Sequence, residues 1–198
     1  MKFYDIDQNS EEWNEIRIAK FTASMFGDLF ADKKTATYQK AITKVAYEKV
    51  TGVSEESYSN KWMARGHELE PIAVENYELY SFNETENGGF YEFNEFVGAS
   101  PDRKIKGKNA GVEIKCPSFN VYNEYLQTKK LPKIYFWQVH GQMLCTGWDY
   151  IDFMPFSHPK LKQVLVRVER DKLILEELEE KLDSCIKEVK QLIEIIQN

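Results

Sequence analysis

The spacing of apolar positions predicts two long helices in the first half of the chain. Between residues 36 and 50, apolar side chains recur every three or four positions, and Gly52 follows as a terminator. A second helix is expected over about 60–80, where Pro71 must either occupy the first turn or kink the helix. Both segments are therefore expected to face a core.

Shorter helices are predicted near the N-terminus and beyond the middle of the chain. Asn9 followed by Glu12 is typical of a helix start, and Thr22 is expected to cap a second short helix. Pro132 opens a helix that reaches about Cys145 and presents glutamines four residues apart on one face.

Strand patterns separate these helices. Residues 89–115 form short β-type segments joined by Gly-containing turns, and two more strands are expected at 149–154 and 163–168. Repeats, low-complexity tracts and Gly/Ser linkers are absent from the sequence. We therefore expect an α/β (α+β) fold in a single domain spanning residues 1–198.

The last predicted helix, residues 171–197, is amphipathic. Its apolar positions follow the 3,4 spacing of a heptad seam over three repeats, which allows a coiled coil or partner helix. Extra apolar residues widen the stripe, as in a helix that packs on its own domain. Both interpretations stay open at this point. The seam consists of Leu175, Leu178, Leu182, Cys185, Val189, Leu192 and Ile196.

Composition narrows the class of protein. The chain is 42% hydrophobic and 14% aromatic, which suffices for a sizeable core. It contains no apolar run long enough to span a membrane, and acidic residues stand where a signal peptide needs an apolar stretch. Three scattered cysteines argue against a disulfide framework or zinc ribbon. We expect a cytoplasmic protein with no membrane partner.

The net charge of −6 initially argues against a nucleic-acid partner. The total, however, combines −9 over residues 55–102 with +6 over residues 103–133. A run of lysines is also typical of an ordinary solvated surface, so charge alone decides nothing. It does allow one basic region beside an acidic one.

The candidate chemistry lies in Ser100-Pro101-Asp102, followed after ten residues by Glu113-Ile114-Lys115. Because side chains alternate along a strand, Glu113 and Lys115 are expected to share a face while Ile114 enters the core and leaves its carbonyl at the site. Asp102, arriving across a hairpin turn, can then lie beside Glu113.

Such oxygen ligands suit Mg²⁺ or Mn²⁺ rather than zinc. A divalent ion held there can activate water and neutralise charge on a phosphate. Lys115 can orient the water, Glu70 adds a carboxylate from the preceding helix, and Gln138 can bond Lys115 or the water. An isolated D…ExK string nevertheless recurs by chance in charged proteins.

In this chain the D…ExK string occurs together with further motifs. Taken together, they resemble the YqaJ/lambda-exonuclease group of viral recombinases, within the PD-(D/E)XK nuclease superfamily. The matching blocks occur in the family's order across most of residues 13–145. They are Arg17 with Thr22-Ala23-Ser24, Gly66-His67-Glu68-Leu69-Glu70-Pro71-Ile72-Ala73 with Tyr77-Glu78, Ser100-Pro101-Asp102, Glu113-Ile114-Lys115-Cys116-Pro117, and Gln138-Val139-His140-Gly141-Gln142-Met143.

The resemblance implies a restriction-endonuclease-like fold: a central mixed sheet flanked by helices, with the long C-terminal helix appended. It implies a Mg²⁺-dependent exonuclease that degrades the 5′ strand of linear double-stranded DNA. The resulting 3′ overhang would serve a single-strand annealing protein in phage-type recombination, in a bacterial or phage-infected cell. Family members can also form a ring-shaped homotrimer.

The resemblance also assigns roles to residues. Glu70, Asp102 and Glu113 would bind the metal together with the Ile114 carbonyl, Lys115 would be catalytic, and Gln138 would support that lysine. For the terminal 5′ phosphate, the expected contacts are Arg17 and Ser24, a cation and a hydroxyl near a helix start.

One position departs from the family: Arg103 follows Asp102 where the family usually has glycine, so this turn must tolerate a side chain that can contact a phosphate. His67 and His140 are expected to make packing or solvent contacts rather than bind metal. Five aromatic residues are expected to be core rather than base-stacking residues. They are Trp13, Trp62, Tyr135, Phe136 and Trp137.

Three alternatives remain on sequence grounds. The chain can be another PD-(D/E)XK endonuclease, a RecB-like nuclease, or an adaptor that binds DNA ends without cleaving them. An iron–sulfur RecB-like member needs a cysteine quartet, which this chain lacks. The adaptor is disfavoured because a degenerate site has no chemical need to keep Asp102, Glu113 and Lys115.

Overall fold

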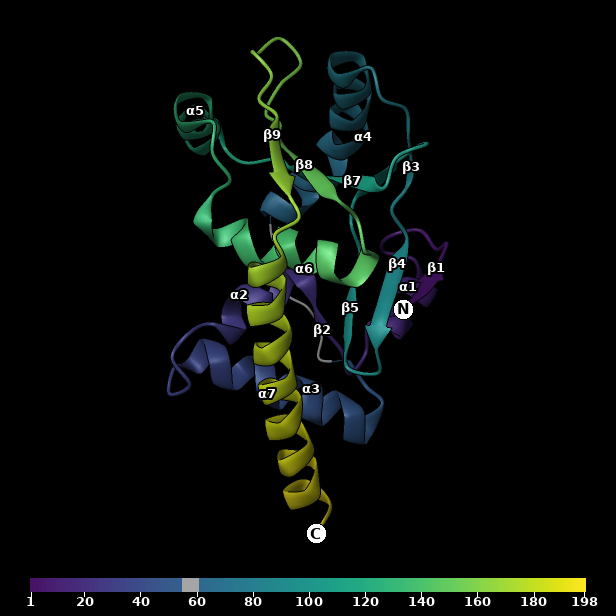
Figure 1. Cartoon of the computed structure of the whole chain (residues 1–198), viewed down its shortest axis with the longest axis vertical. Helices are drawn as coiled ribbons and strands as arrows, with labels where there is room; N and C mark the ends of the chain where they lie inside the picture. The colour runs from purple at the N-terminus through teal and green to yellow at the C-terminus, as the bar shows by residue number, and fades with distance from the viewer. Residues whose placement is uncertain (55–60) are drawn as a thin grey trace.

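Two mixed sheets form the centre of the molecule, which a computed structural model describes for residues 1–54 and 61–198, with side chains from residue 65 onward in the second range (Figure 1). One sheet has the strand order β1-β4-β5-β2 and the other β3-β6-β7-β8-β9. The strands are β1 (Lys2–Tyr4), β2 (Phe21–Thr22), β3 (Thr85–Asn87), β4 (Phe90–Asn94), β5 (Val97–Ala99), β6 (Arg103–Ile105), β7 (Ala110–Lys115), β8 (Tyr150–Pro155) and β9 (Val166–Glu169).

Helices flank both sheets. In Figure 1, α4 and α5 lie at the same end of the molecule as β7, β8 and β9, while α2, α3 and α7 lie at the other end, with α6 between them. The helices are α1 (Glu11–Ile16), η1 (Ala23–Met25), α2 (Phe26–Leu29), α3 (Ala36–Thr51), α4 (Lys61–Ser81), α5 (Phe119–Thr128), η2 (Lys133–Tyr135), α6 (Phe136–Thr146) and α7 (Lys172–Gln197). The expected α/β class, with helices around mixed sheet structure and a long C-terminal helix, is confirmed, and the strands form two mixed sheets where one central sheet was expected.

Several local predictions need correction. The first helix is capped by Ser10, whose hydroxyl accepts a hydrogen bond from the Trp13 amide, whereas Asn9 takes a left-handed conformation. Thr22 occupies the predicted N-cap but makes no side-chain capping bond. Of the two alternatives for Pro71, the first turn is excluded, because Pro71 lies inside α4. The pattern also missed α5 and the short strands β1, β2 and β3.

The C-terminal helix α7 packs on its own fold. Five seam residues are buried in a cluster with side chains of α3, α2 and β5, whereas Ile196, at the distal end, is 50% exposed. The amphipathic-helix interpretation therefore holds for most of the seam. The buried five are Leu175, Leu178, Leu182, Cys185 and Val189.

A second cluster fixes α4 against the five-stranded sheet. Ala73 and Tyr77 of α4 pack against side chains of β6, β7 and β8. The Tyr77 hydroxyl donates to Asp152 Oδ2 at 2.9 Å, and Arg167 binds both oxygens of the same carboxylate. These contacts set the position of the α4 segment that carries Glu70. None of the helices that the structure describes is long and apolar enough to cross a membrane.

Candidate active site

The β6–β7 hairpin brings the predicted acidic residues together. Arg103 of β6 pairs with Val112 of β7, so Asp102, immediately before β6, lies beside the next part of β7. Asp102 Oδ2 accepts a hydrogen bond from the Ile114 amide at 2.6 Å. Ile114 itself is buried in the sheet core, and Glu113 and Lys115 take the opposite face of the strand, as alternation predicts.

The Asp102 loop is held by contacts that the sequence did not indicate. Gln8 Nε2 donates to the Pro101 carbonyl at 3.2 Å and approaches Asp102 Oδ1 at 3.4 Å. A Cβ atom at Gly88 would lie 1.8 Å from the Pro101 oxygen, so only glycine allows this approach. The indole of Trp13 donates to Ser100 Oγ at 2.8 Å. The N-terminal segment thus fixes the loop that carries Asp102.

Glu113 lies at the centre of a dense polar cluster. Lys115 Nζ and Gln138 Nε2 each lie 2.5 Å from Glu113 Oε1, and Gln142 Nε2 lies 2.5 Å from Oε2. Gln138 and Lys115 thus contact the same carboxylate oxygen, while the support of Lys115 by Gln138 stays a prediction. Gln142 is an additional site residue, and its spacing of four from Gln138 on one helix was the available signal.

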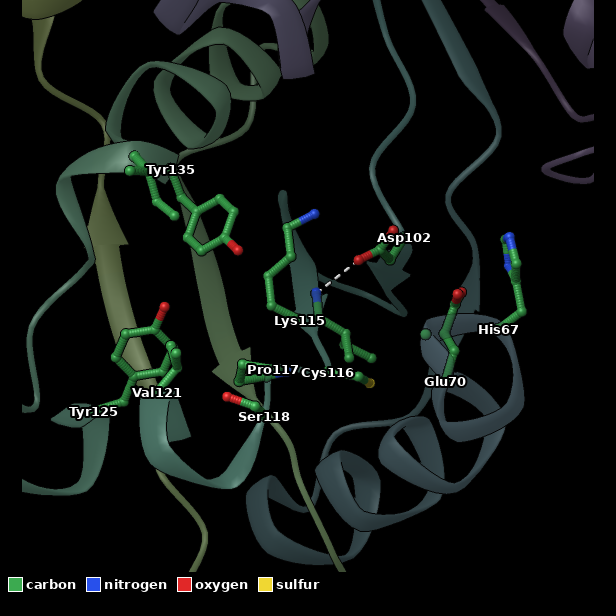
Figure 2. Close-up of a pocket in the computed structure, with 13 residues that line it drawn as sticks. His67, Glu70, Asp102, Lys115, Cys116, Pro117, Ser118, Val121, Tyr125 and Tyr135 are labelled. Carbon is green, nitrogen blue, oxygen red and sulfur yellow. Dashed lines mark hydrogen bonds between the residues drawn. The ribbon is translucent and has the colours of Figure 1, made fainter. Parts of the chain in front are cut away.

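A cavity of about 710 Å³ lies beside this cluster and is lined by Lys115. Figure 2 shows Glu70 and His67 on α4 at one side, with Lys115 and Tyr135 across from them. The lining thus combines charged groups with an apolar wall from α5 and η2. Its residues are Gly66, His67, Glu70, Asp102, Ile114, Lys115, Cys116, Pro117, Ser118, Val121, Tyr125, Ile134 and Tyr135.

The acidic groups of this cavity repel one another. Desolvation, followed by the nearby Glu113, raises the pKa of Asp102 well above its usual range. Desolvation also raises the pKa of Glu70, and Glu113 adds to the increase. Desolvation alone would lower the pKa of Lys115, but Glu113 and Asp102 more than reverse this and raise it. Lys115 therefore carries a full positive charge at neutral pH.

The donors in this site are oxygens. In the described part of the chain, no three carboxylate, imidazole or thiol groups lie together in a ready metal site. Glu70, Asp102 and Ile114 nevertheless line the same cavity. The pKa values of Glu70 and Asp102 are raised first by desolvation and then by Glu113, and a bound cation would favour the charged form of both carboxylates. This chemistry fits a hard divalent ion.

A family model described as the YqaJ-like viral recombinase domain matches residues 12–149. The chain belongs to the YqaJ-like viral recombinase family. The matched range includes every residue that the sequence singled out for the site.

Solved structures agree with this assignment. The crystal structure of an alkaline exonuclease (LHK-Exo) from Laribacter hongkongensis is 30% identical, with a TM-score of 0.87, covering 95% of this chain and 96% of that one. The same values apply to LHK-Exo in complex with dAMP. A phage related exonuclease from Haemophilus somnus 129PT shares the fold, with a TM-score of 0.67 at 18% identity and coverage of 92% and 99%. Proteins with curated functions provide no match.

Arg17 of this YqaJ-like domain has an available guanidinium. Its Cζ lies 3.8 Å from the centroid of the Trp13 ring, and it makes no ion pair or side-chain hydrogen bond with the described residues. Burial lowers its pKa to about 10, which still leaves it charged at neutral pH. Ser24 is exposed, with its hydroxyl 3.3 Å from that of Thr22. Trp13 connects Arg17 to the loop before Asp102.

The remaining polar candidates have mainly structural contacts. Arg103 donates to Thr85 Oγ1 at 3.2 Å, and its side chain also lines a smaller cavity beside Asp102. His140 is buried, with its ring centroid 4.5 Å from that of Phe136. His67 is exposed at the cavity rim. The side chain of Trp62 lies outside the described residues.

The other aromatic candidates and the cysteines are partly or fully buried. Trp137 stacks on Phe30 with ring centroids 3.6 Å apart, as expected of a packing residue. Tyr135 differs, because it lines the cavity with its ring 5.3 Å from Lys115 Nζ. All three cysteines are free, and Cys116 lines the cavity.

Proposed function

We propose that this YqaJ-like protein is a recombination-associated DNA exonuclease that requires Mg²⁺, with Mn²⁺ as a substitute, and degrades the 5′ strand of linear duplex DNA. The 3′ overhang it leaves would be passed to a single-strand annealing protein. The observation that carries this proposal is that Asp102 and Lys115 line one cavity together with Glu70, while Glu113 pairs with Lys115, in a chain related to an alkaline exonuclease.

Each residue has a chemical task in phosphodiester hydrolysis. Lys115, charged and held by Glu113, would orient the attacking water and stabilise negative charge as the water loses its proton. The amide groups of Gln138 and Gln142 keep both Glu113 oxygens in fixed positions. The apolar wall of the cavity leaves room for the nucleotide and limits competing water.

Four oxygen donors would hold the metal: Glu70, Asp102, Glu113 and the Ile114 carbonyl. When bound, Mg²⁺ lowers the pKa of a coordinated water and offsets charge on the phosphate. The family of nucleases to which this chain belongs supports a divalent ion, and the oxygen-only donor set favours Mg²⁺ or Mn²⁺.

The 5′ polarity depends on Arg17 and Ser24. A charged guanidinium that forms no ion pair with the described residues and an exposed hydroxyl are suited to a terminal phosphate, which offers several acceptor oxygens. A ring-shaped trimer is the proposed assembly, and its solution mass should be three times the 23.2 kDa of one chain. Sedimentation equilibrium measures this mass directly, and a monomer would contradict the trimer.

The decisive experiment is digestion of a linear duplex that carries a 5′ phosphate on one strand only. With Mg²⁺, we expect loss of the phosphorylated strand, and with EDTA, no loss. Equal loss of both strands, or cutting of a closed circle, would contradict the 5′-end mechanism and indicate another nuclease of this superfamily. Binding of DNA ends without any cleavage would indicate the adaptor.

Two variants test the assigned roles. Lys115→Ala should abolish hydrolysis while DNA binding remains, because it removes the charge beside the water but leaves the phosphate contacts.

Arg17→Ala should slow digestion of 5′-phosphorylated ends selectively. Equal slowing on phosphorylated and hydroxyl ends would remove Arg17 from the 5′-phosphate site.

A further inference from the structure

Three exposed lysines stand at one edge of the cavity. Lys129, Lys130 and Lys133 lie in the segment 129–133, here called the lysine loop, which follows α5 and ends at the first residue of η2. The residues on either side of this loop line the cavity, Tyr125 before it and Ile134 after it. The loop therefore borders the proposed active site.

These lysines are available to a ligand. None of the three forms an ion pair with a residue that the structure describes. The neighbouring sequence contributes little opposing charge, because Glu124 is the only acidic residue between positions 114 and 148. Their ammonium groups are thus exposed and uncompensated.

The lysines of the β6–β7 hairpin are different, although they belong to the same basic stretch of sequence. Lys104 Nζ lies 2.8 Å from Glu86, and Lys106 Nζ lies 3.2 Å from Glu84. Lys108 donates to the Asn83 side chain at 2.6 Å. Strand β3 and the residues just before it therefore contact all three hairpin lysines, two of them through carboxylates, whereas the three lysines of the lysine loop have no such partner among the described residues.

The backbone of the loop supplies an independent observation. Lys129 is the C-cap of α5 and has a φ of +48°, in the left-handed region that favours glycine. Its amide donates to the Tyr125 carbonyl at 3.0 Å, which ends the helix. A lysine at this position carries a conformational cost that glycine would avoid. The backbone conformation at this position therefore gives no reason for a lysine rather than a glycine.

We propose that the lysine loop binds the phosphodiester backbone of the DNA strand next to the cavity, with Lys129, Lys130 and Lys133 as the contacting residues. The proposal rests on the proposed function, since it takes DNA as the substrate. Lysines act on phosphates as flexible point charges and release condensed counterions, so the contacts carry no base specificity. They hold the strand while the terminal nucleotide occupies the cavity.

The test compares two triple variants that remove the same charge. In EDTA, where no hydrolysis occurs, binding to a labelled 5′-phosphorylated duplex is measured over a range of salt concentrations. The variant K129Q/K130Q/K133Q should bind roughly tenfold or more weakly at low salt, and its salt slope should fall by about 2 to 3. The hairpin variant K104Q/K106Q/K108Q should keep the wild-type slope.

Variants of Lys129 distinguish an effect on DNA binding from an effect on the stability of the fold. Lys129→Gly removes one charge and also the left-handed strain, so we expect weaker DNA binding together with a melting temperature that rises by about 2 °C. The matched Lys129→Gln should weaken binding equally without that rise. A lysine that served the fold alone would give the opposite result, with stability lost and affinity unchanged.

The outcomes are distinct from failure of the proposed function. If the wild-type chain neither binds nor cleaves DNA, the proposed function is wrong. If it binds and cleaves but the loop variant retains the wild-type affinity and slope, only the lysine-loop proposal is overturned. An equal loss of DNA affinity in both triple variants would also overturn the lysine-loop proposal, because the effect would then reflect net charge rather than the position of the lysines.

Discussion

Glu113 shows how the site depends on individual side-chain contacts. The residue is 1% exposed, yet its carboxylate has a charged donor and two amide donors. A buried carboxylate needs such partners, because loss of one leaves a polar group desolvated without compensation. The glutamines of α6 therefore hold the Glu113 carboxylate, although their amide groups do not titrate and carry no charge.

We predict that Gln142→Leu destabilises the fold by about 1–3 kcal/mol, because it removes the donor to Glu113 Oε2. Cleavage or metal affinity should fall by about 10–100-fold, as for other residues that orient a metal ligand. Urea unfolding and a Mg²⁺ activation curve measure the two effects. Gln191→Leu, at an exposed position of α7, is the control and should change neither. If Gln142→Leu had the stability and the Mg²⁺ activation of the wild type, the Glu113 carboxylate would be held without this amide.

His140 makes stability depend on pH. Burial lowers the pKa of this histidine, with Asp171 opposing the shift in part, and its Nδ1 atom has no hydrogen-bond partner among the described residues. The unfolded chain therefore binds a proton at a higher pH than the folded chain. The contribution of neutral His140 to the free energy of unfolding is fully present above about pH 6.5 and is lost as the pH falls from there toward the pKa of His140 in the folded chain.

We expect the His140→Phe variant to lose less stability than the wild type between pH 7.5 and 5.5. The contribution of one such group is at most about 1.4 kcal/mol per pH unit. Phenylalanine also keeps the contact with the Phe136 ring. Urea unfolding at the two pH values provides the comparison, and identical pH dependence in both proteins would exclude His140 as the titrating group.

At the scale of elements, α7 shows why a pattern identifies a helix but not its partner. A heptad seam and a domain-packing stripe bury the same positions, and only the position of α3 and α2 against α7 decides between them. The helix α5 was missed although Tyr122 and Tyr125 have helical spacing. The strands β1 and β2 have only three and two residues, and exist because partner strands supply their hydrogen bonds.

A pair of α7 variants tests its packing. Leu178→Ala should cost about 2–5 kcal/mol of unfolding free energy, because this side chain is fully buried against the core. Ile195→Ala should stay within about 0.5 kcal/mol, because Ile195 is 73% exposed. Denaturant unfolding of both proteins measures the difference. Equal costs would indicate that the distal end of α7 is also covered in solution, as at a subunit interface.

At the scale of the molecule, the single domain over residues 1–198 remains a prediction. It is supported by contacts between distant parts of the chain, since α7 packs on α3 and α6 contacts both sheets. We expect one cooperative unfolding transition, with coincident curves from far-UV circular dichroism and tryptophan fluorescence. Two separate transitions would divide the chain into independent units. The cytoplasmic location also remains a prediction.

The effect of the charged residues also depends on the structure of the whole molecule. The total of −6 and the basic stretch 103–133 are properties of the sequence, but ion pairing is a property of the fold. The register of β3 with β6 sets Glu86 opposite Lys104, which neutralises part of that stretch. The lysine loop, which we propose as the DNA contact, has no ion pair with the described residues, in contrast to Lys104 and Lys106.

The sequence by itself determined the helices α3 and α7 and the shared face of Glu113 and Lys115, because helical periodicity and strand alternation are local. Hydrogen bonding of Asp102 to Ile114 across the hairpin also follows from short-range geometry. Only the tertiary structure decided what holds Glu113, which lysines are free, and what covers α7. Those properties depend on which distant segments meet, and burial, ion pairing and desolvation arise only once they do.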